Sequence, residues 1–395
     1  MTYDLSKLAI AIASNTPGMP TGYGVQAELL AHRLLHAKAK VGAFSNYGLE
    51  GAISEIPTPF GEIEHYPKGL SHYSDDIMPH HFAHFKAKHK NRQAFILTLY
   101  DAWVYKNPKL DELPIWSWIP IDHVTPHPDV VKWAMKDNVT PISMSPHGER
   151  LLTSAGIENT YIPHSVDMKL YKPTKKINGK LTREFMGVPE DAFLVGMVAA
   201  NKANGQVHRK AFAENLMAFK FLLKDVPNAL LYIHSDPSKA YGGFDLGNLL
   251  RVIDIPSESV LFPQPMEYRY GFSSEHMAAF YTAMDVLLAP SYGEGFGVPT
   301  IEAQACGTPV ITSDFAASPD LVSEDCFVVD GQPFWDEPQG SWFMIPKIPS
   351  IYKALQSAYE QRQETSEASI EFVKQFDDAY VWQNYWMPFL ESKIQ

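Results

Sequence analysis

Two glutamates eight residues apart stand in the stretch 289–314, whose residue types suit a ligand with phosphates and hydroxyls. Glu294 lies within a run of three glycines, and Glu302 follows inside a predicted helix. The free N–H groups at a helix start favour an anion such as phosphate. Because carboxylates repel phosphate, we expect Glu294 and Glu302 to face neutral hydroxyl groups.

The elements around the two acids follow from apolar runs and helix-end signals. The run Asp285–Ala289 predicts a buried parallel strand. Pro299 suits the first position of a helix, where its missing N–H costs nothing, and Gly307 suits the helix end. Thr308–Thr312 begins the next strand, so this segment predicts half of a mononucleotide-binding fold.

Further chemistry-bearing residues stand at loops after predicted strands. Arg209 and Lys210 precede the predicted helix Lys210–Leu223 and supply local positive charge. Asp122 and His123 come just past a strand's carboxyl end, where doubly wound domains keep functional side chains. A purely structural capping role for Asp122 is the alternative interpretation.

Composition indicates a soluble globular chain of two domains. The 395 residues exceed a typical single core, and 45% are apolar and 20% charged. The only cysteines, Cys306 and Cys326, argue against a disulfide scaffold and for a reducing compartment. No apolar run is long enough to cross a bilayer, so we expect a cytoplasmic protein.

The formal net charge of −12 is unevenly spread along the chain. Residues 1–170 hold 15 Lys/Arg and 17 Asp/Glu, whereas the remaining residues hold 18 and 28. This balance disfavours a duplex nucleic-acid binder, which usually carries a basic footprint. An acidic second half that binds a diphosphate must concentrate its cations locally, as Arg209 and Lys210 do.

Strand-like and helix-like segments alternate through both halves, which predicts an α/β fold with parallel sheets. In the first half, strands are predicted at Lys7–Ile12, Val41–Ser45, Ala94–Leu99, Ile115–Ile119 and Val139–Met144, with a helix over Gly24–Ala37. In the second half, strands are predicted at Phe193–Ala199, Ala229–His234, Val260–Phe262, Val286–Ala289 and Pro309–Thr312.

The segment from Glu294 to Val310, E-G-F-G-V-P-T-I-E-A-Q-A-C-G-T-P-V, resembles the E-x7-E signature of retaining glycosyltransferases of the GT-B fold, family 4. The resemblance implies two Rossmann-like, doubly wound domains that face a cleft. It places an acceptor-side domain at 1–170, a linker at 171–190 and a nucleotide-sugar-binding domain at 191–372. A C-terminal helix at 373–395 would cross back onto the first domain.

The same resemblance implies transfer of a sugar from a UDP- or GDP-sugar, with retention and without a metal or other cofactor. Its catalytic group would comprise Glu294, Arg209, Lys210, Asp122 and His123. The donor-binding residues would be Gly22, Gly24, Gly295, Phe296, Gly297, Val298 and Glu302. Asn201 stands where relatives commonly have an arginine, so neutralisation of the diphosphate would depend more heavily on Arg209 and Lys210.

The acceptor and two alternative functions stay open at the level of sequence. The basic, aromatic tract His80–Arg92 is either a solvated helix face or a surface for an anionic acceptor or membrane headgroups. The acceptor could be a small molecule, a glycan, a lipid-linked sugar, a protein or a modified nucleic acid. A nucleotide-sugar-binding protein without turnover and a GT-B sugar-nucleotide epimerase are the alternatives, and oligomeric state is open.

Overall fold

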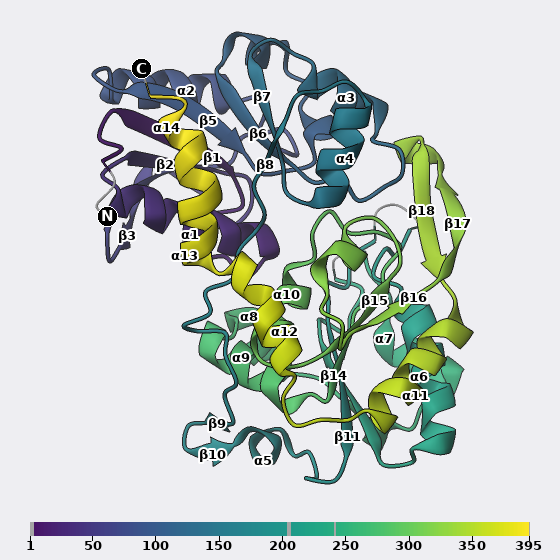
Figure 1. Ribbon diagram of the computed structural model, residues 1–395. Helices are drawn as coiled ribbons and strands as arrows, with labels where there is room; N and C mark the ends of the chain where they lie inside the picture. The colour runs from purple at the N-terminus through teal and green to yellow at the C-terminus, as the bar shows by residue number, and fades with distance from the viewer. Residues whose placement is uncertain (1–3, 204–206, 241, 395) are drawn as a thin grey trace. The chain divides into compact units, whose positions relative to one another are not determined.

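The computed structural model describes residues 4–203, 207–240 and 242–394. The chain divides into two compact units: unit 1 comprises Met1–Ile121, Thr125–Ser165 and Asp378–Gln395, and unit 2 comprises Asp122–Val124 and Val166–Asp377. Each unit has its own central sheet and its own hydrophobic core (Figure 1). No helix within the described residues is long and apolar enough to cross a membrane.

Unit 1 is built on an eight-stranded sheet with the strand order β3-β4-β2-β1-β5-β6-β7-β8. Its strands are β1 Leu8–Ser14, β2 Lys40–Ser45, β3 Ser54–Thr58, β4 Gly61–Tyr66, β5 Gln93–Thr98, β6 Ile115–Ile119, β7 Val139–Ser143 and β8 Thr160–Tyr161. The neighbours are parallel except for β3 and β4, which pair antiparallel. β1 and β6 are buried along their whole length, as parallel strands covered on both faces should be.

The helices of unit 1 are α1 Gly22–His36, α2 Met78–Lys88, α3 Pro128–Ala134 and α4 Pro146–Ser154. The C-terminal segment adds α13 Asp378–Val381, a π-helical turn at Trp382–Trp386 and α14 Met387–Glu391. Within unit 1, this segment packs its aromatic rings on β6: Trp386 lies 5.0 Å from Trp118, and Phe389 lies 5.1 Å from Trp116, between ring centroids. These contacts bury the tryptophans of β6.

Unit 2 contains a six-stranded, wholly parallel sheet in the order β13-β12-β11-β14-β15-β16. Its strands are β11 Phe193–Val198, β12 Ala229–His234, β13 Val260–Leu261, β14 Val286–Leu288, β15 Val310–Ser313 and β16 Phe327–Val329. Its longer helices are α6 Phe212–Asp225, α7 Leu246–Ile253, α9 Ser274–Ala283, α10 Val298–Ala305 and α11 Ile348–Glu360, with the shorter α8 Pro265–Tyr270 and α12 Glu367–Val373. The predicted α/β class with parallel sheets is confirmed in both units.

Residues 171–190 are not the linker that their composition predicts. They contain the short strands β9 Lys176–Ile177 and β10 Lys180–Leu181 and the helix α5 Thr182–Met186. Arg183 of α5 binds Asp285, with 2.8 Å between Nη2 and Oδ2, and so ties this segment to the start of β14. The turn residues that suggested a flexible linker form a tight hairpin instead.

Two further features depart from the predicted organisation of the second unit. A long hairpin, β17 Gly331–Asp336 and β18 Ser341–Pro346, was not predicted. The tripeptide Asp122–Val124, predicted to belong to the first domain, is part of unit 2, because Val124 pairs with Trp342 of β18. This tripeptide and the hairpin bring candidate site residues together within unit 2.

Candidate functional site

Arg209, Lys210 and Glu294 form one ion-pair cluster in unit 2, although they are far apart in sequence. Arg209 Nη1 lies 2.8 Å from Glu294 Oε2, and Lys210 Nζ lies 2.5 Å from Glu294 Oε1. Arg209 Nη1 also donates to the carbonyl of Gly293 at 2.6 Å. The expectation that Glu294 faces neutral hydroxyls is therefore corrected: in this structure it neutralises one of the two cations.

The electrostatics of the cluster keep Glu294 ionised. Burial opposes ionisation, but the charges of Arg209 and Lys210 outweigh it and lower the pKa of Glu294 to about 2. Burial also lowers the pKa of Lys210, against the opposing charge of Glu294. Two cations and one carboxylate leave a formal charge of +1, and about a third of the Arg209 side chain stays accessible to a ligand.

The backbone around the cluster explains how two loops are held together. Ala211, which caps α6, adopts a left-handed φ of 49°, which turns the chain sharply after Lys210. Tyr292 N–H donates to the Arg209 carbonyl at 2.8 Å. Asn215, inside α6, donates to the carbonyl of Pro290 at 3.1 Å. These bonds fix the basic pair against the glycine loop that carries Glu294.

The glycine loop ends at the start of α10, as predicted, and the predicted donor-binding residues there differ in role. Gly297 caps the helix with a φ of 103°, a conformation that favours glycine. Val298, the first helical residue, comes one position before Pro299, so the helix begins one residue earlier than predicted. Phe296 is buried against Phe376, so only its backbone faces the neighbourhood of Gly295.

Glu302 lies in the second turn of α10 and is paired with a neutral hydroxyl, as expected for it. Its Oε2 accepts a hydrogen bond from the hydroxyl of Tyr281 at 2.8 Å. Burial raises the pKa of Glu302, against the hydrogen bonds from Tyr281 and Tyr171. The predicted contact of Glu302 with ribose hydroxyls stays a prediction.

Asp122 and His123 join the same cluster from the tripeptide that pairs with β18. Asp122 Oδ1 accepts from His123 Nδ1, and Asp122 Oδ2 lies 3.8 Å from Arg209 Nε. Burial opposes ionisation, but the hydrogen bond from His123 and the charge of Arg209 lower the pKa of Asp122. His123 Nε2 lies 3.6 Å from Asp336 Oδ2, at the end of β17. The predicted catalytic residues thus lie together within unit 2.

Gly22 and Gly24 lie in unit 1, in the first turn of α1. The Thr21 hydroxyl accepts from Gly24 N–H at 3.0 Å and itself accepts from Asn15 Nδ2 at 2.8 Å. The N–H of Gly24 therefore already has a partner within the helix cap. The predicted donor contact of this loop stays a prediction.

The basic tract His80–Arg92 is largely used to build unit 1. Met78, Phe82 and Phe85 bury one face of α2. His89 Nε2 lies 2.7 Å from Glu64 Oε1, and Lys88 Nζ lies 3.2 Å from the same oxygen. These contacts support the solvated-helix interpretation for part of the tract, and its role towards an acceptor or membrane stays a prediction.

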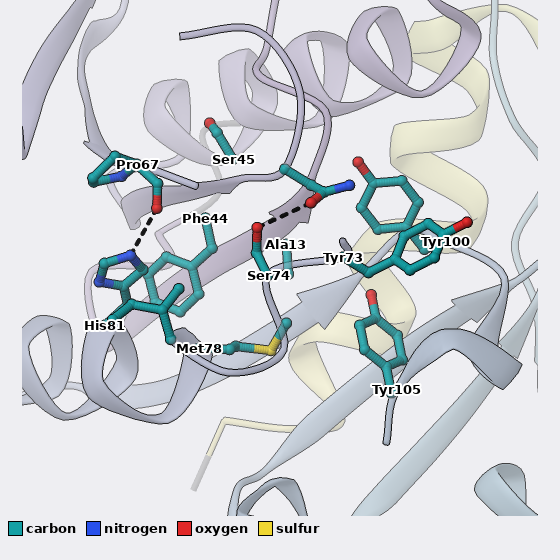
Figure 2. A pocket seen from close by; sticks show the side chains of 12 residues that line it. Ala13, Phe44, Ser45, Pro67, Tyr73, Ser74, Met78, His81, Tyr100 and Tyr105 are labelled. Carbon is teal, nitrogen blue, oxygen red and sulfur yellow. Dashed lines mark hydrogen bonds between the residues drawn. The ribbon is translucent and has the colours of Figure 1, made fainter. Parts of the chain in front are cut away.

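A small hollow in unit 1 lies beside this tract at the carboxyl ends of β1 and β2 (Figure 2). Ser74 donates to Asn46 Oδ1 at 2.9 Å, and His81 Nε2 lies 2.9 Å from the Pro67 carbonyl. The volume of about 10 Å³ is that of roughly one water molecule. The hollow is therefore too small to hold a sugar.

Sequence reasoning missed several residues that complete the site. Asp336 and Phe343 come from the unpredicted hairpin, and Tyr281 comes from α9. Nothing in the local sequence pattern distinguishes them, because their roles arise from long-range packing. Asn201, expected to weaken the cationic site, donates to the carbonyls of Asp236, Ser238 and Phe244 at 2.8–3.2 Å and so organises the neighbouring loop.

Comparison with known protein families and sequences places the similarity in unit 2. Residues 256–336 match the family model of glycosyl transferases group 1. A D-inositol 3-phosphate glycosyltransferase of Corynebacterium jeikeium is 27% identical over 174 residues, 43% of this chain and 39% of the relative. A glycosyltransferase of Sulfolobus islandicus rod-shaped virus 1 is 32% identical over 117 residues, 27% of this chain and 35% of the relative. In both, the chain covers well under half of the relative's length.

Solved structures resemble the chain over nearly its whole length. Sucrose-phosphate synthase from Thermosynechococcus elongatus has a TM-score of 0.69 at 20% identity, with 98% of each chain covered. Anabaena HepE, solved with UDP and glucose, has a TM-score of 0.65 at 15% identity and covers 98% of this chain and 100% of its own. The predicted GT-B fold and the predicted resemblance to GT-B glycosyltransferases are confirmed.

Proposed function

We propose that this chain, with its GT-B fold and its resemblance to glycosyltransferases, transfers a sugar from a nucleotide diphosphate donor with retention of configuration. The observation that carries the proposal is the cluster of Arg209, Lys210 and Glu294 beside the start of α10. Cations and a helix N-terminus suit a diphosphate, and buried carboxylates suit sugar hydroxyls. The donor is a UDP- or GDP-sugar, and the acceptor is open.

In this mechanism, Arg209 and Lys210 stabilise the negative charge that develops on the leaving diphosphate. Guanidinium offers five N–H donors, so Arg209 can bind a phosphate oxygen while it keeps its bond to Glu294. Lys210 adds a compact second charge 2.5 Å from the same carboxylate. The two cations take the role that a metal would otherwise have, and we therefore propose transfer without a metal.

The two glutamates then divide the neutral part of the donor between them. Glu302 accepts hydrogen bonds from the ribose, as it accepts one from Tyr281 in this structure. Glu294 orients the transferred sugar and supports positive charge at its ring. Neither carboxylate acts as a covalent nucleophile, which agrees with the front-face substitution that the E-x7-E resemblance implies.

Donor binding is tested by thermal shift with UDP-, GDP-, ADP- and TDP-sugars. A ligand at about 100 times its Kd adds about 2.7 kcal/mol of apparent stability. We expect one nucleotide class to stabilise the protein and Lys210→Ala to remove most of that gain. If no nucleotide stabilises the wild-type protein, the donor site is refuted. Binding without release of nucleotide diphosphate, across a panel of acceptors, would favour the binding protein without turnover.

A further inference from the structure

The Asp122–His123 pair is asymmetric in how its members are enclosed. Asp122 Oδ1 contacts Nδ1 of His123, and Asp336 Oδ2 lies 3.6 Å from Nε2. The ring of Phe343 stacks on the imidazole with centroids 3.9 Å apart and planes inclined by 29°. Only 4% of the His123 side chain is exposed. Both ring nitrogens face carboxylates, so neither is directed at a ligand.

Asp122, by contrast, is the more accessible member and faces the cationic cluster. Its side chain is 19% exposed, and its second oxygen lies 3.8 Å from Arg209 Nε. Its backbone carbonyl packs against the glycine loop: a Cβ at Gly293 would lie 2.1 Å from that oxygen. The Asp122 carboxylate therefore stands next to the loop that carries Glu294.

The β17–β18 hairpin holds this tripeptide in place through three of its residues. Val124 N–H donates to the Trp342 carbonyl at 3.1 Å, and Trp342 N–H donates back to Val124 at 2.9 Å. Phe343, the next residue, covers one face of the imidazole of His123. Asp336, across the hairpin, faces its far nitrogen. The hairpin thus fixes the orientation of His123, which in turn fixes Asp122.

We propose that Asp122 is the member of the pair that contacts the transferred sugar, and that His123 and Asp336 are positioning residues. This inference rests on the proposed function, because it assigns roles within the same donor site. The ligand group is a sugar hydroxyl, which donates a hydrogen bond to the Asp122 carboxylate. The lowered pKa of Asp122 agrees with this role, because an ionised, weakly basic carboxylate accepts hydrogen bonds rather than protons.

Calorimetric binding of paired ligands separates the two roles without knowledge of the acceptor. The probes are UDP against UDP-glucose and GDP against GDP-mannose, and the pair that binds the wild-type protein is used. The ratio of the two Kd values gives the contribution of the sugar alone. We expect Asp122→Ala to bring this ratio to within about twofold of one while the affinity for the diphosphate falls less than about threefold.

Deoxy-sugar donors then identify direct contact. Removal of the hydroxyl that Asp122 binds should weaken binding to the wild-type protein about tenfold or more and should add nothing in Asp122→Ala. In His123→Asn and Asp336→Asn we expect a smaller ratio, with the discrimination against the same deoxy donor retained. Glu337→Gln is the matched control, because Glu337 follows Asp336 directly and contacts only Trp335 among the printed partners of its carboxylate.

The reverse pattern would overturn the assignment. If the His123 variant loses discrimination against the deoxy donor and Asp122→Ala keeps it, the imidazole is the contact residue. If neither variant changes the sugar contribution, the pair lies outside the sugar site. Failure of the proposed function gives a different result, since the wild-type protein would then bind neither diphosphate. Wild-type melting profiles of each variant exclude loss of folding as the cause.

Discussion

At the scale of the residue, the site is an alternating chain of charges. Asp336, His123, Asp122, Arg209 and Glu294 follow one another, and Lys210 closes the chain. Each carboxylate therefore lies between two nitrogen-bearing groups. Such a network holds side chains in place before a ligand arrives, which reduces the free energy needed to organise the site on binding.

The lowered pKa of Glu294 predicts how stability depends on pH. Its ordinary value of 4.5 falls to about 2, so the ionised form contributes stability above pH 4.5 that is lost as the pH falls towards 2. We expect Glu294→Gln to lower the free energy of unfolding at pH 7 by up to about 3 kcal/mol. Urea unfolding at pH 7, 5, 4 and 3 should show this difference shrinking with pH. A difference that stays constant to pH 3 would contradict the assignment.

At the scale of the element, two segments that sequence did not predict shape unit 2. The β17–β18 hairpin contributes Asp336 and Phe343 to the site. The segment with β9, β10 and α5 packs along the start of β14. There, Asp285 accepts from Arg183 Nη2 and Arg362 Nε at 2.8 Å each. One buried carboxylate thus joins α5, β14 and the segment after α11.

This junction predicts a large effect of Asp285→Asn on stability. Loss of the charge leaves Arg183 and Arg362 without their partner, and breaking such a buried pair costs about 3 kcal/mol. Asp254→Asn is the matched control: its side chain is 95% exposed and pairs with Lys220, so we expect less than about 1 kcal/mol. Urea unfolding measures both. Equal effects of the two substitutions would show that the junction does not stabilise unit 2.

At the scale of the whole molecule, the chain combines two units with separate cores, each assembled from segments distant in sequence. Residues 378–395 complete unit 1, and the tripeptide 122–124 completes unit 2. The candidate residues Arg209, Lys210, Glu294 and Asp122 lie in unit 2. Gly22 and Gly24 lie in unit 1.

This division predicts that donor binding stabilises one unit selectively. We expect two transitions in differential scanning calorimetry, because each unit has its own core. The nucleotide diphosphate that binds should raise only the transition of unit 2, by about 2.7 kcal/mol at 100 times its Kd. Asp285→Asn identifies that transition, because it should lower the same one. A single transition, or an equal rise of both, would contradict this expectation.

The sequence by itself determined the parallel α/β fold, the strand–loop–helix around Glu294 and the basic pair Arg209–Lys210. These features are local: apolar runs mark buried strands, and glycine and proline mark helix ends. Only the tertiary structure decided that Glu294 pairs with both cations and that Asp122 and His123 meet Asp336. The physical reason is that these contacts join residues from 84 to more than 200 positions apart, and no local pattern encodes which loops a fold brings together.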